Sequence, residues 1–554
     1  MPALVLGPLL RYVDDRVATV WVQTDAACEV EVLGHTARTW CVDGHHFALV
    51  VLDELAGGER HEYDVRLDGE RAWPQDDSPF PAPSVRLLDA GRPIDLVFGS
   101  CRITRPHEPP YVLRAHEHPD GQGIDALRAY ALRAAHQDGP LPDLMLMLGD
   151  QIYADQPSPA LQEAFDARAA GRPDDAPEDE LADFTDYALA YREAWSDPAI
   201  RWLLSTVPTA MVFDDHEIHA EWRISQGWLE EMGAEPWFDR HIRAGLAAYW
   251  AFQHVGNLSP GELAAGGLYD AVREADDAGE LLAARMDTEG HQRGHSRWSY
   301  AREVGDARLV VIDSRAGRQV TPGDRKLISD EEWDWIRRQA AKPARHLLLA
   351  SSVPFLLAPG LHHVEAFDEA LTDGAWGRLG VRAGEKLRRL GVLDHWASFQ
   401  ATFHRLAELL EDVAHGRCGH DAPKSIVLLS GDVHHCYLAE VGWRAGAGAD
   451  DGVARPPVWQ AVGSAFRKEL APHERAAIML GHSSVGERLA RRLSAKAGVA
   501  PLPLDWRVVE RPDYANAVTT LTLDGDACSL RCEAVADDWH DPRLRTSFTR
   551  ALTR

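Results

Sequence analysis

Hydrophobic and polar positions alternate with a period of two over about the first 88 residues. Residues 17–23, 28–32 and 61–67 show this alternation, and short polar or glycine turns separate them. The pattern is typical of strands with one buried face. Its regular spacing predicts a small all-β sandwich of the immunoglobulin or fibronectin-III type. The proline-rich stretch at 79–84 (PFPAPS) predicts a linker after it.

From residue 92 the pattern changes to near-continuous apolar runs that end in polar turns. Such runs are typical of strands buried on both faces of a sheet in an α/β domain. The runs lie at 94–98, 144–148, 210–213, 309–312, 346–350 and 426–430. Helical spacing follows at 184–204, 330–341 and 394–413, and 518–523 with 529–535 predicts a closing hairpin. Surface insertions are expected near 170–182, 360–390 and 470–500. We therefore expect two domains, residues 1–88 and 92–540.

Composition places the chain among ordinary globular proteins. Of its 554 residues, 45% are hydrophobic and 26% are charged. No apolar run is long enough for a membrane-spanning helix. The first 20 residues resemble neither a signal peptide nor a twin-arginine signal. The seven cysteines are scattered and form no CxxC pair, so we expect a reduced, cytoplasmic protein.

The charge balance is strongly acidic. Asp and Glu number 86 against 58 Lys and Arg, which gives a formal net charge of −28. Such a surface repels polyphosphate backbones, so we expect no nucleic-acid groove and disfavour a nuclease. A small phosphate-bearing ligand would need a local positive site, of which bound metal is the most plausible. The sequence carries no indication of an oligomeric state.

Polar turns that carry chemistry follow four of the predicted strands. They are GSCR at 99–102, GDQIYAD at 149–155, DDHE at 214–217 and SGDVHH at 430–435. Residues just past the carboxyl ends of strands line the crevice where α/β sheets bind ligands. Cys, Asp, Tyr and His in these turns form a metal-binding set rather than a Ser-His-Asp set.

The candidate ligands divide into two chemical types. Thiolate, phenolate and imidazole donors suit a strongly Lewis-acidic metal such as ferric iron, and they come from Cys101, Tyr153 and His434. Asp215 and Asp432 offer only hard oxygen, which suits Ca²⁺, Mg²⁺ or Mn²⁺.

Asp150 is placed to bridge the two ions. Two ions about 3.5–4 Å apart can hold one hydroxide, lower the pKa of its parent water and neutralise phosphoryl oxygens. His216, next to Asp215, is a candidate proton donor to the departing alkoxide.

The ordered set GSCR, GDQIYAD, DDHE and SGDVHH resembles the alkaline phosphatase D (PhoD-like) family of calcineurin-like metallophosphoesterases. The opening LGPLLRYVDDRVATVWVQT is similar to that family's small leading domain. The resemblance implies a four-layer α-β-β-α sandwich and hydrolysis of small phosphate monoesters or diesters by metal-held hydroxide. It implies ferric iron plus calcium, with the iron on Cys101, Asp150, Tyr153 and His434. The second ion would lie on Asp150, Asp215 and Asp432, with His216 as the general acid.

Two features depart from the family pattern. The wider superfamily usually supplies a histidine from the strand before the last motif, whereas residues 347–354 offer only Ser351 and Ser352. The second ion is therefore expected to lack a nitrogen ligand. The chain also lacks the export signal of secreted members, so its physiological substrate need not be theirs.

Each candidate residue has an ordinary structural reading as well. In isolation, Cys101 would be a small buried hydrophobe, Asp150 a turn residue and Tyr153 half-buried packing, but the motif context favours ligation for all three. Asp214 and Asp155 are expected to be supporting groups rather than ligands.

Other polar residues near the motifs have weaker claims to a role. His435 is expected to face away from His434 or to support the ligands from behind. Arg102 and Arg315 follow strands. For each of them we expect either binding of a phosphate oxygen or an ion pair at the sheet edge. His107 is expected to be a solvated loop histidine, as are His116 and His118. Asp394 and Trp396 are expected at the rim or in packing.

One competing hypothesis comes from another class of protein: a non-catalytic, metal-stabilised binding module of the same fold. It predicts metal content without turnover. The complete motif set, with His216 intact, favours the enzyme.

Overall fold

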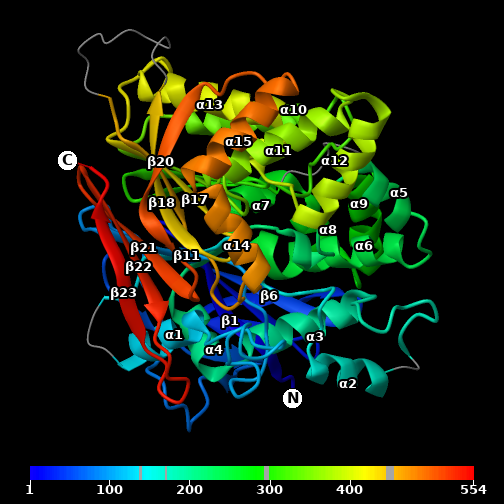
Figure 1. Ribbon diagram of the computed structural model, residues 1–554. Coiled ribbons are helices and arrows are strands. Elements are labelled where there is room, and N and C mark those ends of the chain that lie inside the picture. Colours follow the sequence, from blue (N-terminus) through cyan, green and yellow to red (C-terminus); the bar gives the residue numbers. More distant parts are fainter. Residues whose placement is uncertain (137–139, 169–170, 292–297, 444–454, 554) are drawn as a thin grey trace.

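The computed structural model describes residues 1–136, 140–168, 171–291, 298–443 and 455–553. Its N-terminal region is a sandwich of two antiparallel four-stranded sheets (Figure 1). The first sheet has the order β1 (Leu4–Val13), β2 (Ala18–Thr24), β6 (His45–Leu52) and β5 (Trp40–Val42). The second has the order β4 (His35–Arg38), β3 (Glu29–Val32), β8 (Val65–Leu67) and β9 (Glu70–Trp73). Inward-facing residues such as Val20, Val30 and Val65 form one core between them. The expected all-β sandwich is confirmed.

The run at 61–67 is not one strand. It is divided between β7 (His61–Glu62) and β8, and β7 pairs with β10 (Ser84–Val85). Tyr63 lies at the break, where its hydroxyl donates a hydrogen bond to the carbonyl of Ser205 at 2.6 Å. The period-two pattern correctly predicted extended backbone over this run. It did not predict that β7 and β8 pair with different strands, a change that occurs at Tyr63 and its contact with Ser205.

Two larger sheets follow in the rest of the chain. The six-stranded sheet has the order β13 (Thr209–Met211), β12 (Leu144–Met147), β11 (Ile94–Gly99), β21 (Ala517–Asp524), β22 (Ala527–Val535) and β23 (Leu544–Ala551). The seven-stranded sheet has the order β14 (Tyr300–Val304), β15 (Ala307–Ile312), β16 (His346–Ser351), β17 (Ser425–Ser430), β19 (Val458–Val462), β18 (Cys436–Trp443) and β20 (Leu504–Asp513). All six predicted apolar runs form strands, and β21 and β22 form the predicted hairpin.

These two sheets pack face to face. Leu96 and Leu146 of one sheet share a core with Leu309, Leu348 and Val427 of the other. Helices α10 (Asp330–Ala340) and α13 (Gln400–Ala414) cover the outer face of the seven-stranded sheet. Helices α1 (Ala126–His136), α3 (Phe184–Trp195) and α4 (Pro198–Thr206) cover the six-stranded sheet. The order is therefore helix, sheet, sheet, helix, as expected (Figure 1).

The N-terminal sandwich is joined to the α/β region by buried contacts. The outer face of its first sheet places Trp21 and Phe47 in the same core as Phe252. The indole Nε1 of Trp21 donates to the carbonyl of Ala251 at 2.9 Å. Arg11, fully buried, donates from Nη2 to the carbonyl of Gln253 at 2.6 Å. Because these groups need their partners when buried, the two regions form one packed unit.

The remaining helices lie between strands. They are α2 (Pro159–Ala167), α5 (Gln226–Met232), α6 (Phe238–Ala248), α7 (Pro260–Gly266), α8 (Leu268–Glu274) and α9 (Gly279–His291). The helical spacing at 184–204 is broken between α3 and α4, where Asp197 caps a helix that begins at Pro198. The stretch at 394–413 opens with a short 3₁₀ turn, η5 (Trp396–Ser398), before α13.

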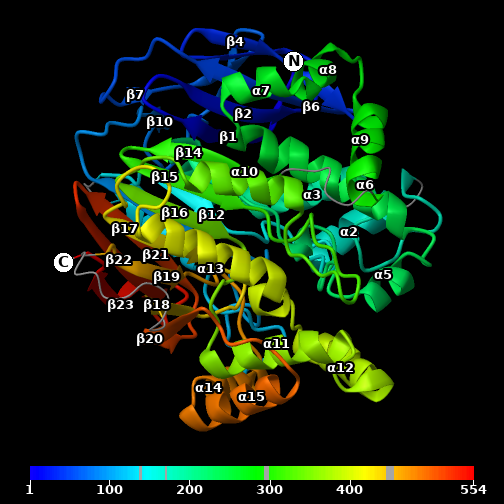
Figure 2. The ribbon, with the colours of Figure 1, turned by 90° about the horizontal axis from the view of Figure 1, so that it is seen from above.

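A helical lobe replaces two of the expected surface insertions. It consists of α11 (Pro359–Thr372), α12 (Gly377–Gly391), α14 (Pro472–Gly481) and α15 (Ser484–Lys496). Figure 2 shows these helices gathered on the side opposite the N-terminal sandwich. The prediction of a surface insertion at 360–390 is wrong for α11, which buries Glu365, Asp368 and Phe367 under its neighbours. No helix in the described part of the chain is both long enough and apolar enough to cross a bilayer.

Candidate metal centre

Four strand ends meet at the junction of the two large sheets. Strands β11, β12 and β13 are parallel neighbours, so their carboxyl ends share one edge. Backbone hydrogen bonds join the first two loops, from the N–H of Arg102 to the carbonyl of Asp150 at 3.2 Å. The loop after β17 comes from the other sheet. Its Asp432 N–H donates to Ser100 Oγ at 2.9 Å, which ties the last motif to the first.

Four of the predicted ligands have a left-handed backbone. The φ angles of Cys101, Asp150, Asp432 and His434 are 51°, 49°, 64° and 51°. For residues with a Cβ this conformation costs about 1–3 kcal/mol and persists where surrounding structure enforces it, often at functional sites. At each of these four residues the backbone leaves the extended conformation of the preceding strand.

The glycine before each motif aspartate has a steric reason. A Cβ on Gly149, which has φ +103°, would lie 2.5 Å from the Cβ of Asp214. A Cβ on Gly431 would lie 2.2 Å from Ser100 Oγ. Both GD pairs are therefore required by close packing of the motif loops on one another.

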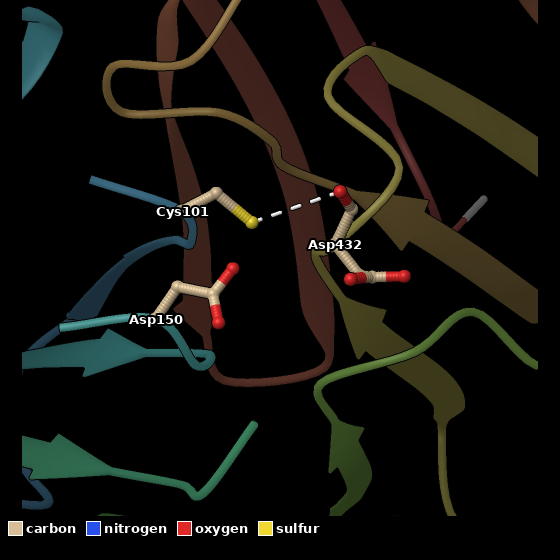
Figure 3. Close-up of side chains that lie close together, drawn as sticks. All are labelled: Cys101, Asp150 and Asp432. Carbon is tan, nitrogen blue, oxygen red and sulfur yellow. Dashed lines mark hydrogen bonds between the residues drawn. The ribbon is translucent and has the colours of Figure 1, made fainter. Parts of the chain in front are cut away.

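The first and last motifs bring a thiol next to carboxylates. Ligand atoms of Cys101, Asp150 and Asp432 all lie within 4.8 Å of one another (Figure 3). Figure 3 shows the Cys101 thiol directed at the main-chain carbonyl of Asp432, 3.6 Å away, with the Asp150 carboxylate beside it. These donors come from three different loops, so only the folded chain assembles them.

Two further groups overlap with this one through Asp150. Asp150, Asp215 and His216 have ligand atoms within 4.8 Å of one another, and so do Asp150, Asp214, Asp215 and Asp432. The Tyr153 hydroxyl donates to Oδ2 of Asp150 at 3.3 Å. Asp150 therefore has the central position expected of a bridging ligand.

Among the described residues, His434 is the one predicted Cys, Asp or His ligand that joins none of these groups. Burial and the nearby Lys468 ammonium lower its pKa to about 3, so the imidazole is neutral and able to donate a lone pair. His435 faces away, as predicted. Its Nδ1 lies 2.6 Å from the carbonyl of Val433, and its ring stacks on Tyr437.

The electrostatics of the donor set fit a cation. Burial, reinforced by neighbouring carboxylates, raises the pKa of Asp150 to about 7 and that of the Cys101 thiol well above its usual value. Oδ1 of Asp150 and Oδ1 of Asp215 are buried without a hydrogen-bond partner. Buried charges require a counter-charge. Ions at this place would satisfy both the orphaned oxygens and the concentrated negative charge.

Arg315 is the positive side chain already among these carboxylates. Its guanidinium bonds to Asp214 and Asp394 and lies 3.1 Å from Asp432 and 3.4 Å from Asp215. It is 1% exposed, so it is a buried ion-pair centre rather than a sheet-edge pair. Asp214 pairs with Arg315 and also belongs to the group of carboxylates around Asp150, so its role as a supporting group stays a prediction.

Two other expectations are settled by buried ion pairs. Arg102 donates from Nε to Asp125 at 2.9 Å, so its charge is already paired inside the protein. The expectation that Asp394 lies at the rim is wrong. Asp394 is 1% exposed and pairs with both Arg315 and Arg318, because two buried guanidinium groups require an internal anion. Trp396 is packing, as expected.

His216 is backed by a carboxylate. Its Nδ1 lies 2.7 Å from Oδ1 of Asp155, which can only accept, so this nitrogen carries the hydrogen. Burial opposes protonation of His216, but Asp155, Asp150 and Asp215 outweigh it and raise the pKa to about 10. The ring also packs on Tyr153, with centroids 4.3 Å apart. The arrangement holds a protonated imidazole beside the carboxylates, which is the state required of a general acid.

Sequence reasoning missed a second imidazole, that of His395. Its Nδ1 lies 2.7 Å from Oε1 of the buried Glu365 on α11, and its Nε2 lies 3.2 Å from Oδ2 of Asp432. Nε2 forms an ion pair with Asp432 but no hydrogen bond. Burial opposes protonation, but Glu365 and Asp432 raise the pKa of His395 well above its usual value. A histidine fixed by a carboxylate at one nitrogen and directed at a candidate ligand with the other has the arrangement of many metal-binding histidines.

Glu217 was also missed as a supporting residue. Its carboxylate accepts hydrogen bonds from the backbone N–H groups of Gln151 at 2.8 Å and Asp214 at 2.8 Å. It also accepts from the Gln253 side chain at 3.0 Å. Glu217 thus fixes the second and third motif loops relative to each other. Its position at the end of the DDHE motif was the only sequence feature that could have indicated this role.

Comparison with known proteins agrees with this geometry. A model of a domain of unknown function, DUF7800, matches residues 1–85, and the PhoD-like phosphatase model matches residues 120–475. The solved structure of PhoD is 13% identical with a TM-score of 0.60, and the match covers 100% of this chain and 91% of that one. Purple acid phosphatase PPD1 from yellow lupin (Lupinus luteus) is 12% identical with a TM-score of 0.44, over 98% of this chain and 74% of that one. A search of curated proteins gave no match. Because the phosphatase model covers more than half of the chain, the protein belongs to the PhoD-like phosphatase family.

Proposed function

We propose that this centre hydrolyses phosphate monoesters or diesters with two bound metal ions. The observation that carries the proposal is the overlap of two donor groups at Asp150, one with a thiol and one made only of carboxylates. Buried oxygens on Asp150 and Asp215 support it, since Oδ1 of each accepts no hydrogen bond from the protein. Membership of the PhoD-like family is consistent with this activity.

The donor chemistry suggests which ion each group holds. Cys101, Tyr153 and His434 would hold ferric iron together with Asp150. Asp215 and Asp432 would hold calcium, magnesium or manganese, again with Asp150.

His395 joins the second set in this proposal. Its Nε2 beside Asp432 would supply the nitrogen donor that Ser351 and Ser352 do not offer. Calcium prefers oxygen ligands, whereas manganese accepts imidazole more readily. The additional donor therefore favours manganese over calcium at the second position.

The protein's own groups would bind the ester and move the proton. When bound, the ions would neutralise the phosphoryl oxygens and lower the pKa of a water molecule. Asp155 fixes the His216 ring through Nδ1, which leaves the Nε2–H free to donate to the departing alkoxide oxygen. Glu217 keeps the loops that carry Asp150 and Asp215 in register.

The net charge of −28 supports a small substrate rather than a polynucleotide. We also keep the division into residues 1–88 and 92–540 and a cytoplasmic location as proposals. The last of these rests on the seven scattered cysteines, which form no CxxC pair.

The first experiment is metal analysis by mass spectrometry together with a panel of p-nitrophenyl phosphate monoesters and diesters. We expect iron, a second metal and turnover, and we expect Asp150→Ala to abolish both metal binding and turnover. Unchanged hydrolysis by Asp150→Ala in a preparation without iron would refute the mechanism. Metal content without turnover on any ester would instead support the non-catalytic binding module.

A second variant tests the division between the two ions. Asp215→Asn should change the metal preference of the second position while the iron content stays constant. Loss of iron from this variant would show that the ligands have been assigned to the wrong ion.

A further inference from the structure

The exposed apolar side chains of this protein are concentrated on the helical lobe. Ten large hydrophobic side chains in the described part of the chain are exposed, and eight of them lie on or beside α12, α14 and α15. These eight are Trp376, Leu379, Leu390, Val392, Met479, Leu480, Val485 and Leu489. Leu379 is 79% exposed and Leu390 is 76% exposed. Clusters of this kind mark interaction surfaces, whereas single exposed apolar residues do not.

The same helices are basic in an acidic protein. Residues 376–392 and 472–496 together contain ten Lys and Arg but only three Asp and Glu, whereas the whole chain has a net charge of −28. Among the described residues, no ion pair engages Arg378, Arg382 or Lys386 on α12, or Arg492 and Lys496 on α15. These cations are therefore available to an external anionic partner.

Helical spacing places the apolar and basic side chains on common faces. On α12, Leu379, Lys386 and Leu390 recur at intervals of seven and four residues, and all are exposed. On α15, Leu489 and Arg492 repeat the pattern. The opposite faces of α12 and α15 pack against α11, which lies beneath them. Both helices lie on one lobe (Figure 2), and the exposure of these side chains places the amphipathic faces toward solvent.

We propose that this lobe docks on an anionic lipid bilayer. Helices with basic and large apolar side chains on one exposed face bind at the boundary between headgroups and acyl chains. The lysine and arginine side chains would contact anionic headgroups, and the leucine, methionine and tryptophan side chains would enter the layer below. A convex lobe suits a deformable bilayer, which needs no complementary groove.

Two other occupants fit the chemistry less well. A twofold dimer through this face would place the basic side chains of one copy against those of the other, because such an interface pairs a patch with itself. Nucleic acid would neutralise the cations but would leave the leucine side chains in water. A bilayer with anionic lipid satisfies both properties of the surface.

The test is co-sedimentation of the full-length protein with vesicles. One set is phosphatidylcholine alone, and the other is phosphatidylcholine and phosphatidylglycerol in equal parts. We expect binding to the second set only, and weaker binding at high salt. The double variants Leu379→Glu/Leu390→Glu and Arg382→Glu/Lys386→Glu should each reduce the affinity at least tenfold.

Matched controls lie on other surfaces. Val51→Glu alters an exposed hydrophobic residue of the N-terminal sandwich, and Arg543→Glu alters an exposed arginine near the C-terminus. Both should bind vesicles as the parent protein does. Failure of the parent to bind phosphatidylglycerol vesicles at low salt would overturn the proposal, and so would unchanged binding by the lobe variants. A dimer in light scattering that the same variants dissociate, without vesicle binding, would assign the face to a second copy and also overturn it.

Discussion

Glu365 fixes the orientation of His395 at the candidate metal centre. Oε1 of Glu365 lies 2.7 Å from Nδ1 of His395, and the opposite ring nitrogen lies 3.2 Å from Asp432. Glu365 belongs to α11, the helix on which the helical lobe is built. A residue of the lobe therefore positions an imidazole next to a carboxylate of the last motif.

His395→Gln should weaken binding of the second ion. Loss of a ligand or of the group that orients it typically costs 10–100-fold in metal affinity. The measurement is a Mn²⁺ titration followed by electron paramagnetic resonance, in which a bound imidazole nitrogen gives a hyperfine coupling. The coupling should disappear in His395→Gln and the affinity should fall less in Glu365→Gln.

His404→Gln is the control for that experiment. His404 is a half-buried histidine on α13 whose Nδ1 bonds to a backbone carbonyl. It should leave both the affinity and the coupling unchanged. An intact coupling in His395→Gln would remove His395 from the proposed ligands.

His216→Asn should slow hydrolysis according to the leaving group. Loss of a general acid costs about 10²–10⁴ in rate when the leaving alkoxide needs a proton. We expect the full loss in kcat with an alkyl phosphate ester and a small loss with a p-nitrophenyl ester, whose leaving group is stable as an anion. Asp155→Asn should show the same dependence with a smaller loss. If His216→Asn instead loses metal, the imidazole is a ligand, as its distance to Asp150 and Asp215 also permits.

Tyr153→Phe should remove visible colour from the iron-loaded protein. A phenolate bound to ferric iron gives a charge-transfer absorption, and phenylalanine provides no such ligand. Absorption spectra of the purified variant and of Tyr130→Phe, a buried tyrosine on α1, make the comparison. A band retained by the Tyr153 variant and equal to that of the control would exclude Tyr153 as a ligand.

Asp394→Asn should destabilise the fold. Asp394 is the buried partner of both Arg315 and Arg318, and breaking a buried ion pair by removing one charge costs about 3–5 kcal/mol. Urea denaturation measures the difference. Asp412→Asn breaks an exposed pair with Arg417 and should cost below about 1 kcal/mol. Equal stability of the two variants would contradict the importance of the buried pair.

Stability should depend on pH through Glu369. Burial raises the pKa of this carboxyl from 4.5 to about 8 in the folded protein, although it accepts the N–H of Gln400. The folded state therefore binds a proton that the unfolded state releases above its own lower pKa. The resulting stabilisation is complete below about pH 4.5 and is lost as the pH rises to 8.

Glu369→Gln removes this titration. Its melting temperature relative to the parent should rise between pH 5.5 and pH 8.5, since the variant keeps a neutral side chain throughout. Glu408→Gln, on the exposed face of α13, should show no such trend. A constant difference between parent and Glu369→Gln over this range would contradict the prediction.

Local patterns predicted the strands and the motif loops well. The apolar runs before Cys101, Asp150, Asp215 and Asp432 specify buried strands. Parallel pairing brings the ends of the first three together, and packing of the two sheets brings the loop with Asp432 to them. Gly149 and Gly431 stand where a Cβ would collide with Asp214 and Ser100 of neighbouring motif loops. These parts of the centre depend on short segments of sequence, so the sequence was sufficient.

Residues fixed by long-range packing were not predictable in this way. His395 follows no strand, and its role depends on Glu365, thirty positions earlier on a helix that we expected to be an exposed insertion. Asp394 is buried because Arg315 and Arg318 lie against it from a distant loop. Neither contact produces a periodic pattern in the sequence, because each joins charged side chains that come together only after the sheets have packed.

The position of Arg315 bears on how the protein matures. Its guanidinium compensates carboxylates from three separate loops within the polypeptide itself. We therefore expect newly made chains to reach the native architecture before any cofactor arrives, with loading as a later, separate event governed by supply of the ions. Protein stripped by a chelator should accordingly retain its circular dichroism spectrum and regain activity on reconstitution.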